Sequence, residues 1–221
     1  MNTLWVSVNT TALESAITNI VEMSVIFQVD GEVIDKKHWN IHPILHEEDV
    51  IYGVIKDPKM FLLSYAGWQE NKSPMYSLEY GPGFFYNKST LSYLKKSPEE
   101  LLLAEQKPKD VLLELLEGLE GRKWSLVGHN APWIADHLKG WAQRCDKDAF
   151  EALHFEKVID TQPFFQVAAA FLPIHGYALK DVAKTFGRSV GLDTQSKLNA
   201  LFSICKEIIH EPSHLLPSQE F

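Results

Sequence analysis

The apolar residues near the start of the chain form short runs separated by turn signals. Leu4–Val8 is a run rich in β-forming residues, and a second run covers Ile20–Phe27 after the segment Asn9–Ala12. Asp30-Gly31 is typical of a tight hairpin turn, and Val33–Ile41 beyond it continues as a third strand. The pattern predicts strand, loop, strand, tight turn and strand, so the first three strands are expected to be antiparallel.

Further along, short apolar runs predict strands and longer segments have helical periodicity. The predicted strands are Trp124–Gly128 and Phe155–Ile159, and Ser97–Glu100 has the signature of a capped helix start with an early proline. The predicted helices repeat an apolar residue every three or four positions, which favours burial of one face. They are Lys109–Leu119, Ala131–Arg144, Gln162–Phe171, Tyr177–Phe186 and Gln195–His210.

The chain of 221 residues shows no marked domain boundary. We expect one domain over residues 1–210, with an insert at about 46–108 and a loose tail at 211–221. Within the insert, Gln69–Thr90 is rich in aromatic residues, glycine and proline. Aromatic residues at this density suit base stacking, a surface for a partner or a small local core, and the sequence leaves these alternatives open.

Composition and charge narrow the function classes. Apolar residues make up 45% and charged residues 23%, as in ordinary soluble proteins. The net charge of −8 weakens the case for nucleic-acid binding without excluding it, because such binders normally display a basic surface. The longest apolar runs are about eight residues, well below the ~20 that span a bilayer, so no membrane association is expected. Cys145 and Cys205 lie far apart with no C-x-x-C pattern, which favours free thiols and a cytoplasmic location.

Four motifs occur in an order that resembles a known enzyme family. Ser7–Ala12 is similar to D-x-E-T-T-G with both acids replaced, and Leu126–Trp133 is similar to v-x-H-N-x-x-F-D. Val158–Thr161 matches a strand that ends in D-T, and Tyr177–Gly187 matches the helix y-x-L-x-x-l-a-x-x-f-g. Together they resemble the DnaQ-like (DEDD) 3′–5′ exonucleases over about residues 3–210. The resemblance implies an α/β RNase H-like fold, a mixed sheet flanked by helices.

The resemblance also implies where a catalytic site would lie. In this family, carboxylates hold two divalent ions about 4 Å apart, and in the histidine (DEDDh) subclass a histidine deprotonates the attacking water. Carried over to this sequence, these positions fall on Ser7, Asn9, Ile134, Thr194 and Asn199. All of them are neutral residues, and Ile134 cannot coordinate a metal at all. The sequence therefore indicates a degenerate, non-catalytic member, for which no cofactor is expected.

Some polar residues around these positions are retained or lie nearby. The residues that match Thr10, Thr11, His129 and Asn130 line the pocket for the terminal nucleotide in the family. Residues of these types also satisfy backbone groups in turns, so a purely structural role stays open. Asp136 and Asp160, joined by Asp181 and Asp193, are a weaker alternative as a substitute metal site. Only in that case would Mg²⁺ or Mn²⁺ be required.

These observations lead to three hypotheses about function. The first is a catalytically inactive interaction or regulatory module that binds a protein partner. It is favoured by the loss of catalytic residues, by the aromatic-rich insert and by the acidic charge. The second is a non-cleaving binder of single-stranded nucleic-acid 3′ ends or of nucleotides. The third is an active metal-dependent 3′–5′ exonuclease with a relocated site. The sequence does not show whether a bound nucleic acid would be DNA or RNA, or whether the domain forms a homodimer.

Overall fold

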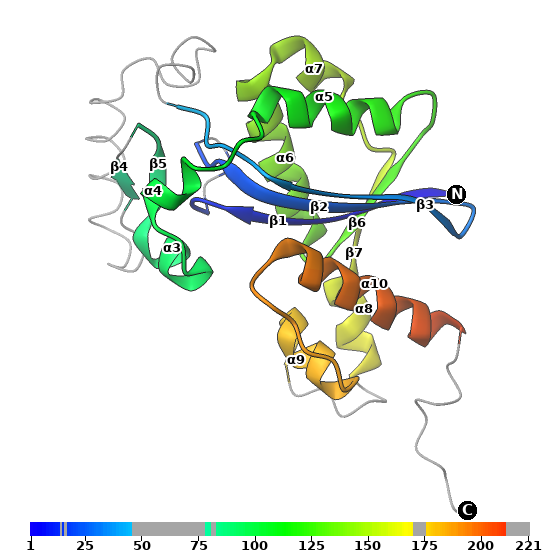
Figure 1. The fold of residues 1–221 in the computed structure, drawn as a ribbon. Helices are drawn as coiled ribbons and strands as arrows, with labels where there is room; N and C mark the ends of the chain where they lie inside the picture. The colour runs from blue at the N-terminus through cyan, green and yellow to red at the C-terminus, as the bar shows by residue number, and fades with distance from the viewer. Residues whose placement is uncertain (14, 16, 46–77, 81–82, 170–175, 211–221) are drawn as a thin grey trace, which may run out of the picture.

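The structure of this chain is a computed structural model that describes residues 1–13, 15, 17–45, 78–80, 83–169 and 176–210 (Figure 1). The predicted tail at 211–221 lies outside the described residues. So do residues 46–77 and 81–82 of the predicted insert, and with them most of the segment Gln69–Thr90.

A five-stranded sheet forms the centre of the fold, with the strand order β3-β2-β1-β6-β7. β1 (Asn2–Thr10), β2 (Ile20–Val29) and β3 (Glu32–Asn40) are antiparallel, while β6 (Ser125–Gly128) and β7 (Lys157–Asp160) continue the sheet in parallel. The predicted mixed sheet with three antiparallel opening strands is confirmed.

The hairpin between β2 and β3 forms where the sequence predicts it. Asp30 and Gly31 both have positive φ, at 49° and 89°. This is the backbone twist that a two-residue hairpin turn requires, and glycine adopts it at no steric cost.

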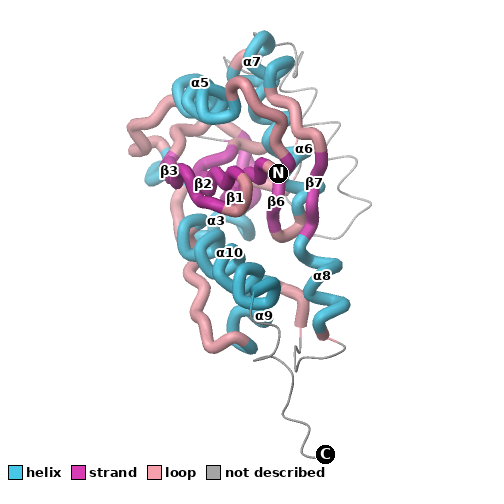
Figure 2. Tube along the Cα trace, turned by 90° about the vertical axis from the view of Figure 1, so that its right-hand side faces the viewer, coloured by secondary structure: helices cyan, strands magenta, loops and turns pink. Residues whose placement is uncertain are grey.

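Helices cover both faces of the sheet (Figures 1 and 2). On one side lie α5 (Pro108–Leu119), α6 (Ala131–Cys145) and α7 (Lys147–Ala152). On the other lie α8 (Thr161–Ala168), α9 (Leu179–Thr185) and α10 (Thr194–His210). None of the described helices is long and apolar enough to cross a bilayer.

A smaller unit lies beside one end of the sheet. It consists of a two-stranded sheet, β4 (Leu78–Tyr80) and β5 (Phe85–Asn87), followed by α3 (Lys88–Leu94) and α4 (Pro98–Leu101). The predicted helix start at Ser97 is confirmed, because the Ser97 and Glu100 side chains each bond to the other's backbone amide.

The alternation of side chains along each strand creates separate cores. Leu4 and Val6 of β1 pack with the helices α5 and α6, whereas Trp5 packs with the helix α10. A third, smaller core forms around Val21 of β2 and is completed by Phe84, Leu91, Leu94 and Leu101.

Val21 lies at an irregularity in the pairing of β1 with β2. Asn9 pairs with Glu22 and Thr10 with Ile20, so Val21 is the extra residue of a β-bulge. The bulge lies next to the polar end of the sheet, where the candidate site is found.

Candidate functional site

Polar side chains gather at one end of the antiparallel strands, on the face that α10 covers. The register places Ser7 of β1 opposite Ser24 of β2, and Ser24 opposite His38 of β3. The neighbouring row runs from Asn9 through Glu22 to Asn40 on the same strands. Because side chains alternate between the faces of a strand, both rows point to the α10 side.

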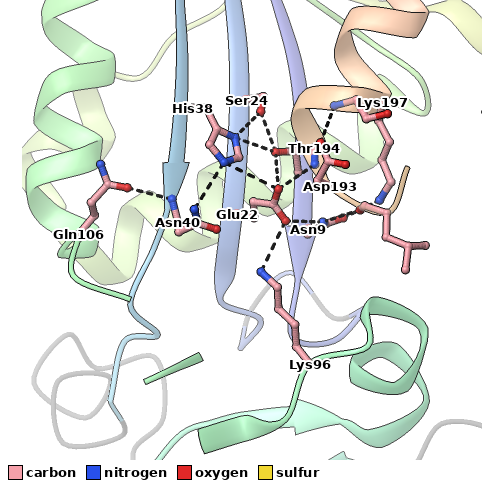
Figure 3. A network of polar contacts seen from close by, with 12 residues as sticks. Asn9, Glu22, Ser24, His38, Asn40, Lys96, Gln106, Asp193, Thr194 and Lys197 are labelled. Carbon is pink, nitrogen blue, oxygen red and sulfur yellow. Dashed lines mark hydrogen bonds and ion pairs between the residues drawn. The ribbon is translucent and has the colours of Figure 1, made fainter. Parts of the chain in front are cut away.

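Glu22 is the centre of this network (Figure 3). Its side chain is buried and accepts hydrogen bonds from Asn9 Nδ2 at 2.8 Å, from the backbone nitrogen of Thr194 at 2.9 Å and from Thr194 Oγ1 at 3.2 Å. Lys96 Nζ lies 3.7 Å from Glu22 Oε2. A buried carboxylate is tolerated when donors and a cation surround it, and all of these are present here.

Lys197 brings a second cation to the same place. Its Nζ donates to Asn9 Oδ1 at 2.7 Å and lies 5.7 Å from the centre of the Tyr93 ring. Burial lowers the pKa of Lys197, while the negative charges of Glu22 and Asp193 act in the opposite direction. The amide of Asn9 therefore joins the Glu22 carboxylate to the Lys197 ammonium.

Hydroxyl groups and an imidazole complete the network beneath the start of α10. Ser24 Oγ lies 2.7 Å from Thr194 Oγ1 and 2.8 Å from His38 Nδ1. A serine beside a histidine is the arrangement of a nucleophile and its base. Ser24 is 2% exposed, however, so no substrate reaches its hydroxyl group in this conformation.

A cavity of about 370 Å³ opens beside Asn9 and Lys197. Its walls include Tyr93 of α3, Trp133 of α6, Thr10 and Leu13. The volume is within the range of small-molecule sites, and the wall combines aromatic side chains with one ammonium group.

The structure brings together some of the residues carried over from the family motifs and separates others. Ser7, Asn9 and Thr194 lie at the same end of the sheet. Ile134 is buried in the apolar core of the opposite layer. Asn199 is exposed and borders another cavity, beside Lys36.

Sequence reasoning missed Lys197, the α10 side chain that reaches Asn9. A helix turns by about 100° per residue, so a residue five positions after Thr194 points about 140° away from it. A residue three positions later points to nearly the same side. Two features of the sequence could therefore have identified these residues. Lys197 lies three residues after Thr194 in a predicted helix, and Glu22 is an acid within an otherwise apolar strand.

The retained polar residues mainly hold the backbone of turns. Thr10 Oγ1 donates to the carbonyl oxygen of Ala12 at 2.7 Å, and Thr11 Oγ1 accepts from the amide of Asn19 at 3.1 Å. Asn130 has a positive φ of 64° and starts α6. Among these candidates, Thr10 also lines the cavity.

His129 lies between the strand end and α8. Its Nδ1 is 3.3 Å from Thr161 Oγ1, and its ring centre is 6.0 Å from that of Phe165. Burial lowers the pKa of His129, and the nearby charge of Asp160 opposes this effect.

The acids considered for a substitute metal site have other surroundings. Asp160 accepts hydrogen bonds from the amides of Asn130 at 2.8 Å and Gln162 at 3.0 Å, so it caps α8. Asp136 is exposed on α6. In the part of the chain that the structure describes, no group of three or more histidine, cysteine, aspartate or glutamate residues is arranged to hold a metal ion. Cys145 and Cys205 are both buried and neither belongs to a disulfide bond, and burial raises the pKa of Cys205 to about 12.

A mixed sheet that opens with three antiparallel strands and is covered by helices on both faces is an RNase H-like fold. Solved structures of exonuclease I have this fold. The chain matches E. coli exonuclease I in complex with a dT13 oligonucleotide at a TM-score of 0.66 and 12% identity, covering 97% of this chain and 42% of that chain. The complex with a dA16 oligonucleotide gives a TM-score of 0.66 and 12% identity, with coverages of 96% and 42%.

The zinc-bound form of E. coli exonuclease I with single-stranded DNA matches at a TM-score of 0.65 and 12% identity, covering 96% of this chain and 41% of that chain. The chain thus spans less than half the length of these exonuclease I chains. No family model and no curated protein matches the sequence. The predicted exonuclease fold is confirmed, and identity at this level shows the fold alone.

Proposed function

We propose that this chain is a non-cleaving exonuclease-fold protein that acts through binding, as an interaction or regulatory module. The observation that carries the proposal is the Lys197 ammonium, which donates to the Asn9 amide oxygen at 2.7 Å. In the family that the motifs resemble, the position of Asn9 belongs to a carboxylate that faces a divalent ion. Here a fixed protein cation faces a neutral amide.

The chemistry of the network supports this proposal. Mg²⁺ and Mn²⁺ bind preferentially to charged oxygen ligands. Glu22 has such oxygens, but they already accept hydrogen bonds from Asn9 and Thr194. A divalent ion would have to displace these donors and would be repelled by Lys96 and Lys197.

Metal binding and cleavage are tested together on the wild-type chain. Titration with Mg²⁺ or Mn²⁺ in a calorimeter should give no binding heat, and a labelled single-stranded oligonucleotide should remain intact. Micromolar metal binding with trimming of the 3′ end would contradict the proposal. If replacement of Asp136 and Asp160 by asparagine then abolished trimming, the relocated active site would be established instead.

The kind of partner is a separate question from cleavage. The acidic net charge of −8 favours a protein over a nucleic acid as the general partner. Recovery of single-stranded nucleic acid with nanomolar affinity, and of no protein, would contradict a protein partner while leaving the non-cleaving character untouched.

The cavity beside Asn9 favours a second candidate function, the binding of nucleotides or single-stranded 3′ ends. Tyr93 and Trp133 offer aromatic surfaces and Lys197 offers a positive charge. Base stacking on an aromatic side chain contributes about 1–3 kcal/mol per base. Two of the exonuclease I structures that share the fold are complexes with a dT13 and a dA16 oligonucleotide, which is consistent with this candidate.

Substitution of Tyr93 by alanine tests the second candidate. The loss of one stacking contact should weaken oligonucleotide binding by roughly 5-fold to 150-fold. Tyr177→Ala is the matched control, because Tyr177 is also an exposed tyrosine and does not line the cavity. Equal affinities of the wild type and Tyr93→Ala would remove the cavity from consideration. Thr11 and Asn130 are poorer probes, because both hold turns.

A further inference from the structure

A second cavity, of about 790 Å³, lies on the far side of α10 from Lys197 and has a different chemistry. Its walls come from β3, from the segment after α9 and from α10. The ionisable residues in the wall are all cations, namely Lys36, Arg188 and Lys206, and three serines supply hydroxyl groups, namely Ser189, Ser196 and Ser203.

Arg188 is held in place by two hydrogen bonds from one of its guanidinium nitrogens. Its Nη2 donates to Ser203 Oγ at 2.9 Å and to Glu207 Oε2 at 2.7 Å. These bonds occupy one nitrogen of the guanidinium group, and a planar guanidinium has further N–H donors on its other nitrogens. A fixed guanidinium group loses little conformational freedom when it binds a phosphate.

The two lysines in the wall differ from Arg188, which is paired with an acid. Neither Lys36 Nζ nor Lys206 Nζ has an ion pair within the described part of the chain. The neighbouring acid Asp35 belongs to the other face of β3, where its carboxylate lies 4.0 Å from Lys37 Nζ. Glu207 is engaged by Arg188, so the cavity keeps a local positive charge.

We propose that this cavity binds phosphate groups, and specifically the backbone phosphates of a single nucleic-acid strand, a ligand that rests on the second candidate function and not on the protein-binding one. Cations with hydroxyl donors are the side chains that contact phosphate oxygens in nucleic-acid complexes. Most of the surface of a chain with net charge −8 repels a polyanion. Contact is therefore confined to places where cations are concentrated, and this cavity is one of them. The site is independent of the aromatic cavity beside Asn9.

The test measures the salt dependence of oligonucleotide binding in the presence of EDTA. A labelled dT oligonucleotide is titrated with the wild-type chain and with Lys36→Gln/Lys206→Gln, and anisotropy is followed. Each phosphate contact contributes about 0.7 to the slope of log affinity against log salt for a single strand, so the double variant should lose about 1.4. Its affinity at low salt should fall on the order of tenfold.

A matched control removes the same charge elsewhere. Lys139→Gln/Lys147→Gln changes exposed lysines of α6 and α7, on the opposite side of the sheet. Its slope and affinity should stay close to those of the wild type. An equal loss in both double variants would mean that net charge alone drives binding, and it would overturn the proposal. Undetectable binding of the oligonucleotide by the wild type would overturn it as well.

Inorganic phosphate distinguishes a strand from a free anion. Phosphate binding is measured in a calorimeter with the wild type and with Lys36→Gln/Lys206→Gln. If the wild type binds phosphate with micromolar affinity, the double variant does not, and the oligonucleotide fails to compete, the cavity binds a free anion and the strand is excluded. Competition between the two ligands supports the strand. Tyr93→Ala separates this proposal from the second candidate function, because it should weaken binding without changing the salt slope.

Discussion

The two faces of β1 and β2 are built from alternate residues of the same strands, and both carry an apolar core, yet they differ at the end where the candidate site lies. Toward α5 and α6, the face consists of apolar side chains such as Val6 and Phe27, packed in the largest core cluster. Toward α10, the end of the face consists of Asn9, Glu22 and Ser24, joined by hydrogen bonds.

The comparison shows what each face requires. Apolar side chains need only to be covered, so their positions are set by shape and volume. Buried polar groups need a particular partner for each donor and acceptor, and here the start of α10 supplies Thr194 and Lys197. The polar end of the sheet therefore fixes where α10 begins more strictly than the apolar face fixes α5.

The largest expected effect comes from breaking the apolar face at Phe27. Its ring is buried, packs edge-on against Trp124 with ring centres 5.5 Å apart, and also lies against the backbone of Gly118. Phe27→Ala should lower the free energy of unfolding by about 3–5 kcal/mol, measured by urea denaturation. The exposed β3 residue Val33 is the control, since Val33→Ala should stay within about 0.5 kcal/mol of the wild type.

Removing the charge of Glu22 disrupts the polar face and should lower the free energy of unfolding by less than Phe27→Ala does. Glu22→Gln keeps the shape but weakens the bonds from Asn9 and Thr194, so we expect a loss of about 1–3 kcal/mol. The exposed Glu120→Gln is the control. A double-mutant cycle with Lys197→Met sharpens the test, because residues in one network should be coupled rather than additive. Additive losses would show that Lys197 does not belong to the network.

A third prediction concerns Asp160, at the end of β7. Because this carboxylate caps α8 and holds the amide of Asn130, Asp160→Ala should cost about 1 kcal/mol. Asp136→Ala, on the exposed side of α6, should change the thermal midpoint very little. The opposite ranking would show that capping by Asp160 contributes little to stability.

The smallest effect is a pH dependence carried by His129. Burial lowers the pKa of His129 in the folded chain, so the unfolded chain binds the proton more readily. Stability should therefore fall as pH drops below about 6.5, the ordinary histidine value. Thermal unfolding across this range should be flatter for His129→Gln than for the wild type. His154→Gln, at an exposed position, is the control and should keep the wild-type slope.

The elements that local chemistry determines were predictable from the sequence. Asp30-Gly31 defines the hairpin by itself, and Ser97 with Glu100 defines a helix start. The ends of helices were less accurate, since α9 covers Leu179–Thr185 where Tyr177–Phe186 was predicted. The helix α7 was not predicted, although Asp146 caps it through the amides of Asp148 and Ala149.

The candidate site was predictable only in part, because it depends on contacts between distant segments. The positions of Ser7 and Asn9 followed from a local motif. Lys197 reaches Asn9 because of how α10 is rotated about its axis where it packs on β1. The family motif instead selects Asn199, five positions after Thr194, which borders another cavity. Lys96 comes from the segment after α3, and no periodicity in the sequence relates it to Glu22.

The bulge at Val21 has a consequence for how the chain tolerates insertions and deletions. Deleting this one residue would restore regular pairing beyond Asn9, with Ile20 still opposite Thr10, but it would remove the Val21 carbonyl oxygen that accepts a hydrogen bond from the Ile41 amide. It would also withdraw Val21 from the cluster with Phe84 and Leu91, which supports the unit that carries Tyr93 and Lys96. The chain should therefore tolerate replacement of Val21 by another apolar residue better than deletion of Val21.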